Sequence, residues 1–263
     1  MEITYLNVAQ FASENLKFSS GQLFADFTKP KSFDTFSYVY LSCCLYDVYK
    51  KRSVKGIRFP QGSGYFHFNN FVWEYFPEGI KSFVLNKTVK ILHEEFDIDE
   101  IEERIANIII DNDINVPIPE VRENVSEITD NIKSHAIYPF MFMRCNYSPL
   151  DKFFDIAIGD IGLGIRNTLI KKNEYSYLAS LTHREAIVKA FDARVTSKAD
   201  ARGLGLTMVS DYFIEEPKGI LFLCSGDGYY MVNYKEVGEA SSSGNLKYNI
   251  DGVQVLLRFR CKE

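Results

Sequence analysis

One stretch, residues 121–136, constrains the fold more than any other part of the chain; it reads VRENVSEITDNIKSHA. Apolar side chains recur in it at helical spacing, which predicts an amphipathic helix with one face on a core. Glu127, Asn131 and His135 follow one another at four-residue steps on a neighbouring face. Such a face can simply be solvated, so it becomes informative only together with the motifs that follow it. The apolar positions are Val121, Val125, Ile128 and Ile132.

Two glycine-rich motifs follow the helix. The first, residues 160–164 with the sequence DIGLG, comes directly after an apolar run that predicts a strand. The second, residues 201–206 with the sequence ARGLGL, opens a predicted helix whose buried face carries Leu206, Val209 and Phe213. Glycine has no Cβ, so the backbone at both motifs can approach a ligand closely. A helix N-terminus also offers free N–H groups that favour phosphate oxygens.

In this order the three motifs resemble the GHKL ATPase superfamily, which includes gyrase B, a heat-shock chaperone, MutL and the histidine kinases. The resemblance covers about residues 117–263 and implies a Bergerat-type ATP-binding domain, with ATP and Mg²⁺ as ligands. The matching residues are Glu127, Asp130 and Asn131 in the asparagine box, Asp160, Gly162 and Gly164 in the first glycine box, and Gly203, Leu204 and Gly205 in the second.

The resemblance gives each matching side chain an expected role. Asp160 would be costly to bury without a donor, and the family uses this residue to accept a hydrogen bond from the adenine amine. Asn131 offers a neutral oxygen ligand to Mg²⁺, which takes few protein ligands besides phosphates and water. Glu127 is the predicted catalytic residue, placed to orient or deprotonate a nucleophile beside the γ-phosphate.

Residues 165–202, between the two glycine boxes, form a predicted lid. Lys198 and Arg202 stand near its end, just before the second glycine box, where their side chains could reach phosphates. A basic, solvated segment is the alternative interpretation of these two residues.

The predicted fold class is α+β. Residues 111–119 carry Asn, Asp and two prolines and mark the best domain boundary. The prediction is a smaller N-terminal α/β domain of unknown role over residues 1–116 and an ATP-binding domain over residues 117–263. The second domain is expected to be a two-layer α/β sandwich with a mixed sheet. The first, which alternates strands and helices, resembles a STAS-like domain.

Local patterns predict further elements. Helices are expected over residues 32–49 and 183–191, and another over 99–110 with Asp99 as its N-cap. Strands are expected over 138–146 and 152–159, joined by a turn at Ser148-Pro149. Asp227-Gly228 predicts a hairpin turn between strands 220–224 and 229–232. A polar loop over 239–245 and a closing strand over 253–260 complete the expectation.

Composition narrows the class of function. The chain has 263 residues, 46% of them hydrophobic and 25% charged, with a formal net charge of −5, so no general attraction to nucleic acid or anionic membrane is expected. No apolar run is long enough to cross a bilayer. The five cysteines lack a CxxC pair, which is typical of reduced, buried thiols. Together with a first segment unlike a signal peptide, this predicts a cytoplasmic protein.

Three activities fit an ATP site on this scaffold. The favoured one is hydrolysis of Mg-ATP to drive a conformational switch of the lid. The second is transfer of phosphate to a protein serine, as in anti-sigma-factor kinases, with Glu127 activating the hydroxyl. The third is an ATP-gated binding module without catalysis. Each implies a protein partner whose identity the sequence does not give, and a homodimer stays open.

Overall fold

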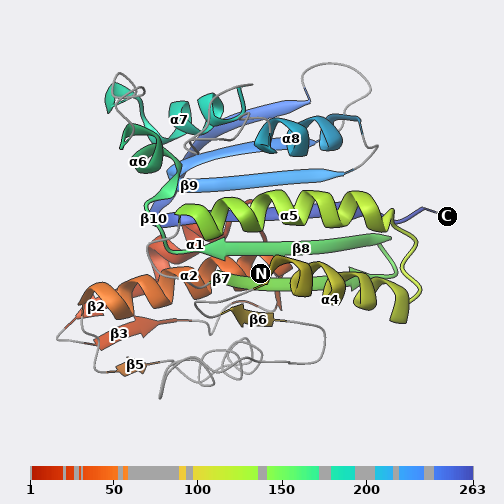
Figure 1. The fold of residues 1–263 in the computed structure, drawn as a ribbon. Coiled ribbons are helices and arrows are strands. Elements are labelled where there is room, and N and C mark those ends of the chain that lie inside the picture. The colour runs from red at the N-terminus through yellow and green to blue at the C-terminus, as the bar shows by residue number, and fades with distance from the viewer. Residues whose placement is uncertain are drawn as a thin grey trace.

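A computed structural model describes residues 2–19, 22–26, 30, 32–52, 56–58, 89–92, 97–135, 141–171, 179–192, 205–215, 219–233 and 240–262. Its centre is a five-stranded sheet in the order β6-β7-β8-β10-β9, and every neighbouring pair in it is antiparallel. Figure 1 shows helices on both sides of this sheet. The strands are β6 (Val89–Leu92), β7 (Met141–Ser148), β8 (Phe153–Asp160), β9 (Ile220–Asn233) and β10 (Ser241–Arg260).

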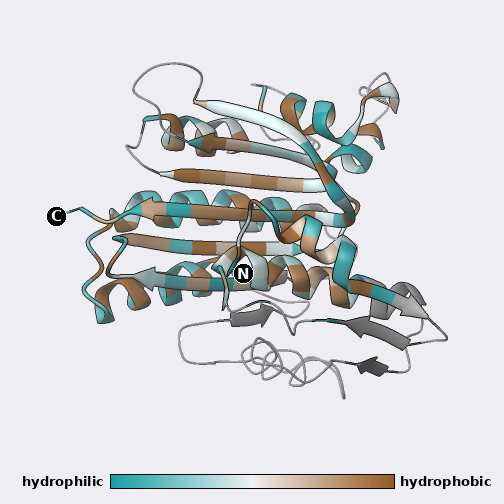
Figure 2. Ribbon diagram, turned by 180° about the vertical axis from the view of Figure 1, so that it is seen from behind, coloured by the Kyte–Doolittle hydropathy of each residue, from teal (hydrophilic) through white to brown (hydrophobic). Residues whose placement is uncertain are grey.

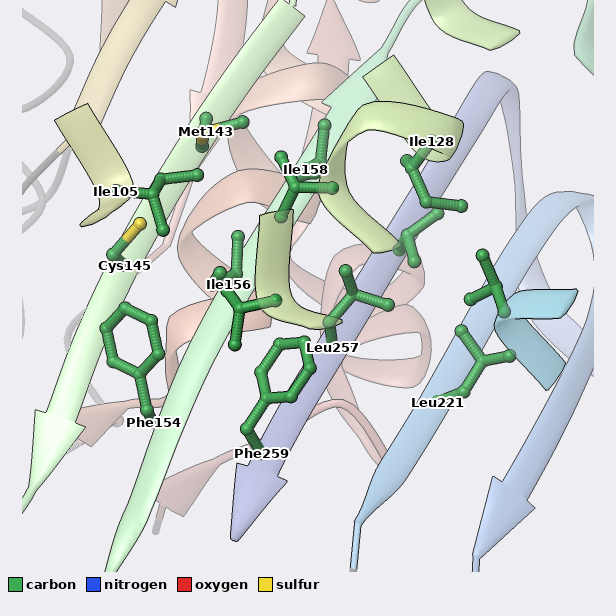
Figure 3. Packing of buried hydrophobic residues seen from close by; sticks show 14 of the residues in the cluster. Ile105, Ile128, Met143, Cys145, Phe154, Ile156, Ile158, Leu221, Leu257 and Phe259 are labelled. Carbon is green, nitrogen blue, oxygen red and sulfur yellow. The ribbon is translucent and has the colours of Figure 1, made fainter. Parts of the chain in front are cut away.

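One face of the sheet is covered by α5 (Ile118–His135), with α4 (Ile98–Asp111) on one side of it and α8 (Gly205–Glu215) on the other (Figure 1). Alternate strand residues project into this layer and meet the apolar stripe of α5 (Figure 3). The stripe is at most 3% exposed at any of its four positions, as the periodicity predicts. The strand residues include Met143, Cys145, Phe154, Ile156, Ile158, Leu221, Leu257 and Phe259.

The opposite face is covered by α1 (Val8–Asn15) and α2 (Thr35–Arg52), which Figure 2 shows from behind. Phe142, Ala157, Phe222 and Leu256 of the sheet lie in one apolar cluster with residues of these two helices. Both faces of the central strands are therefore buried, which explains why β8 reads as a nearly continuous apolar run instead of an alternating one.

Short strands surround this core in the first part of the chain. β1 (Glu2–Ile3) pairs in parallel with β4 (Ser32–Phe33). β2 (Leu16–Ser19) and β3 (Gln22–Ala25) pair in an antiparallel manner, and β3 pairs in parallel with β5 (Gly56–Arg58). Two further helices of the described residues, α6 (Gly164–Ile170) and α7 (His183–Ala190), lie at the end of the sheet where β8 terminates (Figure 1).

The α+β class is confirmed, with one correction: the main sheet is antiparallel, not mixed. Helices α5 and α8, from residues 117–263, cover one face of the sheet, whereas α1 and α2, from residues 1–116, cover the other. The second face is filled by α2, an N-terminal helix in which apolar and polar residues show little helical segregation. The division of the chain at residue 117 stays a prediction; β6, which precedes this point, pairs with β7, which follows it.

Several local predictions are confirmed, and four are wrong. The helix expected from residue 32 begins at Thr35, because Ser32–Phe33 pairs with β1 as strand β4. The N-cap of α4 is Asp97, whose carboxylate accepts the Asp99 N–H, so the helix begins earlier than expected. Residues 241–245 pair with β9 as part of β10 and do not form a loop. Asp227-Gly228 forms no turn, because β9 continues through it. A Cβ at Gly228 would lie 2.5 Å from the Arg184 backbone nitrogen, so this glycine admits α7 against the strand.

Candidate functional site

Asp160, the last residue of β8, is a buried carboxyl at only 2% exposure. Its Oδ1 accepts the Val253 N–H at 2.7 Å, and the Gly162 N–H also donates to the carboxylate. Burial nevertheless raises the pKa of this carboxyl from 3.8 to about 7, and the two N–H donors only partly oppose the rise. A carboxylate has about four lone-pair sites, so it can accept a further donor.

An irregularity in β10 brings the Val253 N–H to Asp160. Between Ile250 and Gln254, β10 advances by four residues while β9 advances by two, from Gly226 to Cys224. The additional residues form a bulge that includes Gly252, with φ of +89°. A Cβ at Gly252 would lie 2.2 Å from the Asp160 carbonyl oxygen and 2.3 Å from Oδ1, so only glycine fits there.

Two buried polar side chains hold the bulge in place. Ser225 Oγ donates to the Gly252 carbonyl at 2.7 Å and accepts the Ile165 N–H at 3.0 Å. Gln254 Nε2 donates to the carbonyls of Asp160 at 3.1 Å and Asp251 at 3.2 Å.

The first residue of α6 is held against the same network. Gly164 has φ of +72°, and its ideal Cβ would lie 2.6 Å from Ser225 Oγ. We call this set the strand-end cluster: Asp160, Gly164, Ser225, Gly252, Val253 and Gln254.

A second set lies on helix surfaces. Glu127, on α5, is partly exposed, and Asn131 follows one turn later with similar exposure. The Glu127 carboxylate lies directly against Gly205, the first residue of α8: a Cβ there would be 2.1 Å from Oε2. Glu127 of the asparagine box and Gly205 of the second glycine box are thus adjacent in space. We call Glu127, Asn131 and Gly205 the helix-end cluster.

Glu127 also borders an open groove of about 450 Å³ between α5 and α4. Arg122 and Glu102 line this groove and form an ion pair with Nε to Oε2 at 3.0 Å. Ser126 and Glu123 complete its polar wall. The Glu127 carboxylate is therefore accessible from solvent along α5.

The two clusters are placed by the same sheet. Helix α5 packs over β8. The C-terminal end of β8 and the C-terminal half of α5 lie toward the same end of the strands (Figure 1). Of the predicted site residues, Glu127, Asn131, Asp160, Gly162, Gly164 and Gly205 belong to the described structure. Lys198, Arg202, Gly203 and Leu204 lie outside the described residues.

Sequence reasoning missed Ser225, Gly252, Val253 and Gln254. They stand on β9 and β10, far along the chain from the motif that contains Asp160. One signal was present: a glycine inside a strand pattern indicates a bulge or a close backbone approach, and Gly252 precedes the apolar run of β10.

No family model and no curated protein matches this sequence. Among solved structures, the mycobacterial sensor histidine kinase MprB is similar at 16% identity and a TM-score of 0.33, over 65% of this chain and 99% of that one. In the part of the chain that the structure describes, no helix has the length and apolar character needed to cross a membrane. The five cysteines are buried free thiols, as predicted.

Proposed function

We propose that this chain binds Mg-ATP at the strand-end and helix-end clusters and hydrolyses it. The observation that carries the proposal is the Asp160 carboxyl, which is buried at the end of β8 and accepts the backbone N–H groups of Val253 and Gly162. Gly164 and Gly252 bring the backbone close beside it, in conformations that L side chains rarely adopt. The exocyclic amine of adenine would supply a further donor to this carboxylate.

We assign the phosphates and the metal to the helix-end cluster. Gly205 begins α8, an 11-residue helix, and free N–H groups and the helix dipole favour anions at such an end. Asn131 would supply a neutral oxygen to Mg²⁺, and the metal would neutralise phosphate charge when bound. Glu127, one turn before Asn131, would orient or deprotonate the attacking water. The switch assigned to residues 165–202 stays a prediction.

Proton release tests the base-recognition part of the proposal. A donor to ionised Asp160 favours the charged form and so lowers its pKa from about 7. ADP binding near pH 7 should therefore release protons, which calorimetry in two buffers of different ionisation enthalpy measures directly. Asp160→Asn should bind ADP more weakly and abolish this release. Equal affinity and equal proton release in both proteins would contradict the assignment.

Phosphate transfer to a protein hydroxyl is a second candidate, favoured by the open groove that Glu127 borders. An acceptor side chain could reach the carboxylate along α5 without entering a closed site. Incubation with γ-labelled ATP and a lysate separates the outcomes: labelled free phosphate supports hydrolysis, and a labelled protein band supports transfer. Neither product, together with retained ADP binding, would favour an ATP-gated binding module.

A further inference from the structure

We infer that Ser225 and Gln254 are positioning residues for the base-recognition carboxylate. They hold the β10 bulge in the shape that directs the Val253 N–H and the Gly252 backbone at Asp160. The inference rests on the proposed function for its consequence in ligand binding, whereas its structural step concerns the ligand-free protein alone.

The bulge needs such support because irregular backbone lacks regular ladder partners. A two-residue excess in β10 breaks the alternation of hydrogen bonds with β9, so buried carbonyl groups must find other donors. The Gly252 carbonyl accepts a hydrogen bond from the Ser225 hydroxyl, and the Asp251 carbonyl accepts one from the Gln254 side-chain amide. Ser225 and Gln254 are both fully buried, at 0% exposure, so water does not compete for these bonds.

Both residues also connect the bulge to the rest of the strand-end cluster. Gln254 Nε2 donates to the backbone carbonyls of both Asp160 and Asp251. One side-chain amide therefore connects Asp160 to the β10 bulge. Its Oε1 in turn accepts the Cys224 thiol at 3.4 Å, which fixes the amide orientation. Ser225 accepts the Ile165 N–H and so connects the bulge to the start of α6.

The support continues behind the sheet. A Cβ at Gly159, the residue before Asp160, would lie 2.8 Å from Val39 Cγ1, 2.9 Å from Cys43 Sγ and 3.1 Å from Gln254 Cγ. Helix α2 therefore packs closely against the same end of β8 that Gln254 contacts. Asp160 cannot move away from the bulge without displacing this packing.

Two variants test the inference, Ser225→Ala and Gln254→Leu. Each removes one buried polar group, loosens the bulge and weakens the Val253 N–H bond to Asp160. Thr129→Val is the matched control: Thr129 is also 0% exposed, and its hydroxyl donates to a backbone carbonyl, that of Val125, at 2.9 Å. This control removes a comparable buried hydrogen bond without touching the strand-end cluster.

The first measurement is the carboxyl titration of Asp160 by carbon-13 NMR in the ligand-free proteins. A weaker N–H bond stabilises the ionised form less, so the titration midpoint should rise by about 0.5–1 in pH in both variants and stay unchanged in Thr129→Val. Cys43 of α2 lies near this end of β8, but burial raises the pKa of its thiol well above the ordinary value of 9.0, so the thiol stays neutral over this range. An unchanged Asp160 midpoint in both variants would overturn the inference.

The second measurement is affinity for ADP and GDP at pH 7. Loss of one supporting bond should weaken ADP binding by about 3- to 10-fold and leave GDP binding unchanged. Wild-type ADP affinity in both variants would overturn the role in recognition. If the wild type itself binds no ADP, the proposed function fails, and the carboxyl titration still decides whether Ser225 and Gln254 position Asp160.

Discussion

The strand-end and helix-end clusters are built by different means. In the strand-end cluster every polar side chain is at most 2% exposed and bonded to backbone, and two glycines have positive φ. In the helix-end cluster the polar side chains of Glu127 and Asn131 are partly exposed on a helix surface. Under the proposed function, the strand-end cluster supplies fixed backbone partners for a base, whereas the Glu127 carboxylate is held beside Gly205 and stays open to the attacking water or hydroxyl.

The largest expected effect belongs to the helix-end cluster. Glu127→Gln removes a base while it keeps side-chain size and helix propensity, so turnover of ATP should fall by about 10²–10⁴. ADP affinity and thermal stability should stay near the wild type, because the side chain is partly exposed and does not belong to the buried network. Steady-state phosphate release measures turnover, and calorimetry measures ADP affinity and thermal stability. Wild-type turnover in this variant would remove Glu127 from the mechanism.

Gly252→Ala should have the next largest effect, this time on stability. Its Cβ would meet the Asp160 carbonyl oxygen at 2.2 Å, a backbone atom that cannot rotate away, in a residue with φ of +89°. Left-handed strain and overpacking together should cost about 2–5 kcal/mol of unfolding free energy. Chemical denaturation measures this cost. A loss below about 1 kcal/mol would show that the bulge adapts to the added methyl group, which would contradict the rigidity of the strand-end cluster.

The sequence predicts the helix-end cluster better than the strand-end cluster, for a physical reason. Glu127 and Asn131 lie on one helix, where a spacing of four residues fixes their adjacency. The partners of Asp160 come from β9 and β10, and a two-residue excess in β10 sets their register. No local rule places such a bulge, so Ser225 and Gln254 read as ordinary strand residues.

The fold shows the same contrast. Amphipathic α5 and the apolar run of β8 were predicted because each carries its own periodicity or length signal. The covering of the second sheet face by α2 was not predicted, because the consecutive residues Val39, Tyr40 and Leu41 are all buried and point to different sides of the helix, which lacks a clear stripe. A helix buried on nearly all sides gives no direction from which to deduce its partner. The hairpin turn predicted at Asp227-Gly228 is wrong because glycine also permits close packing, and Gly228 lets α7 approach β9.

The raised pKa of Asp160 predicts that the stability of the fold depends on pH. Its folded pKa of about 7 lies above its ordinary value of 3.8, so the folded state binds the proton more tightly and stability falls as pH rises from about 4 to 7. Between pH 5 and pH 8 the wild type should lose on the order of 2 kcal/mol more than Asp160→Asn, which does not titrate. Urea denaturation of both proteins at the two pH values measures the difference. Parallel losses would mean that Asp160 is ionised in the folded protein throughout.

The smallest expected effect on stability distinguishes the two clusters most directly. Gly205→Ala places its Cβ against Glu127 Oε2, the far end of a flexible side chain, so the carboxylate can rotate away where the backbone at Gly252 cannot. Unfolding free energy should change by less than about 1 kcal/mol, since alanine also favours the helix. Turnover should fall by about tenfold, because the displaced carboxylate is no longer held at the start of α8. In the double variant with Glu127→Gln, the Gly205→Ala change should have no further effect, because both act through one carboxylate. Additive losses in phosphate release would show instead that Gly205 serves the phosphates by itself, independently of Glu127.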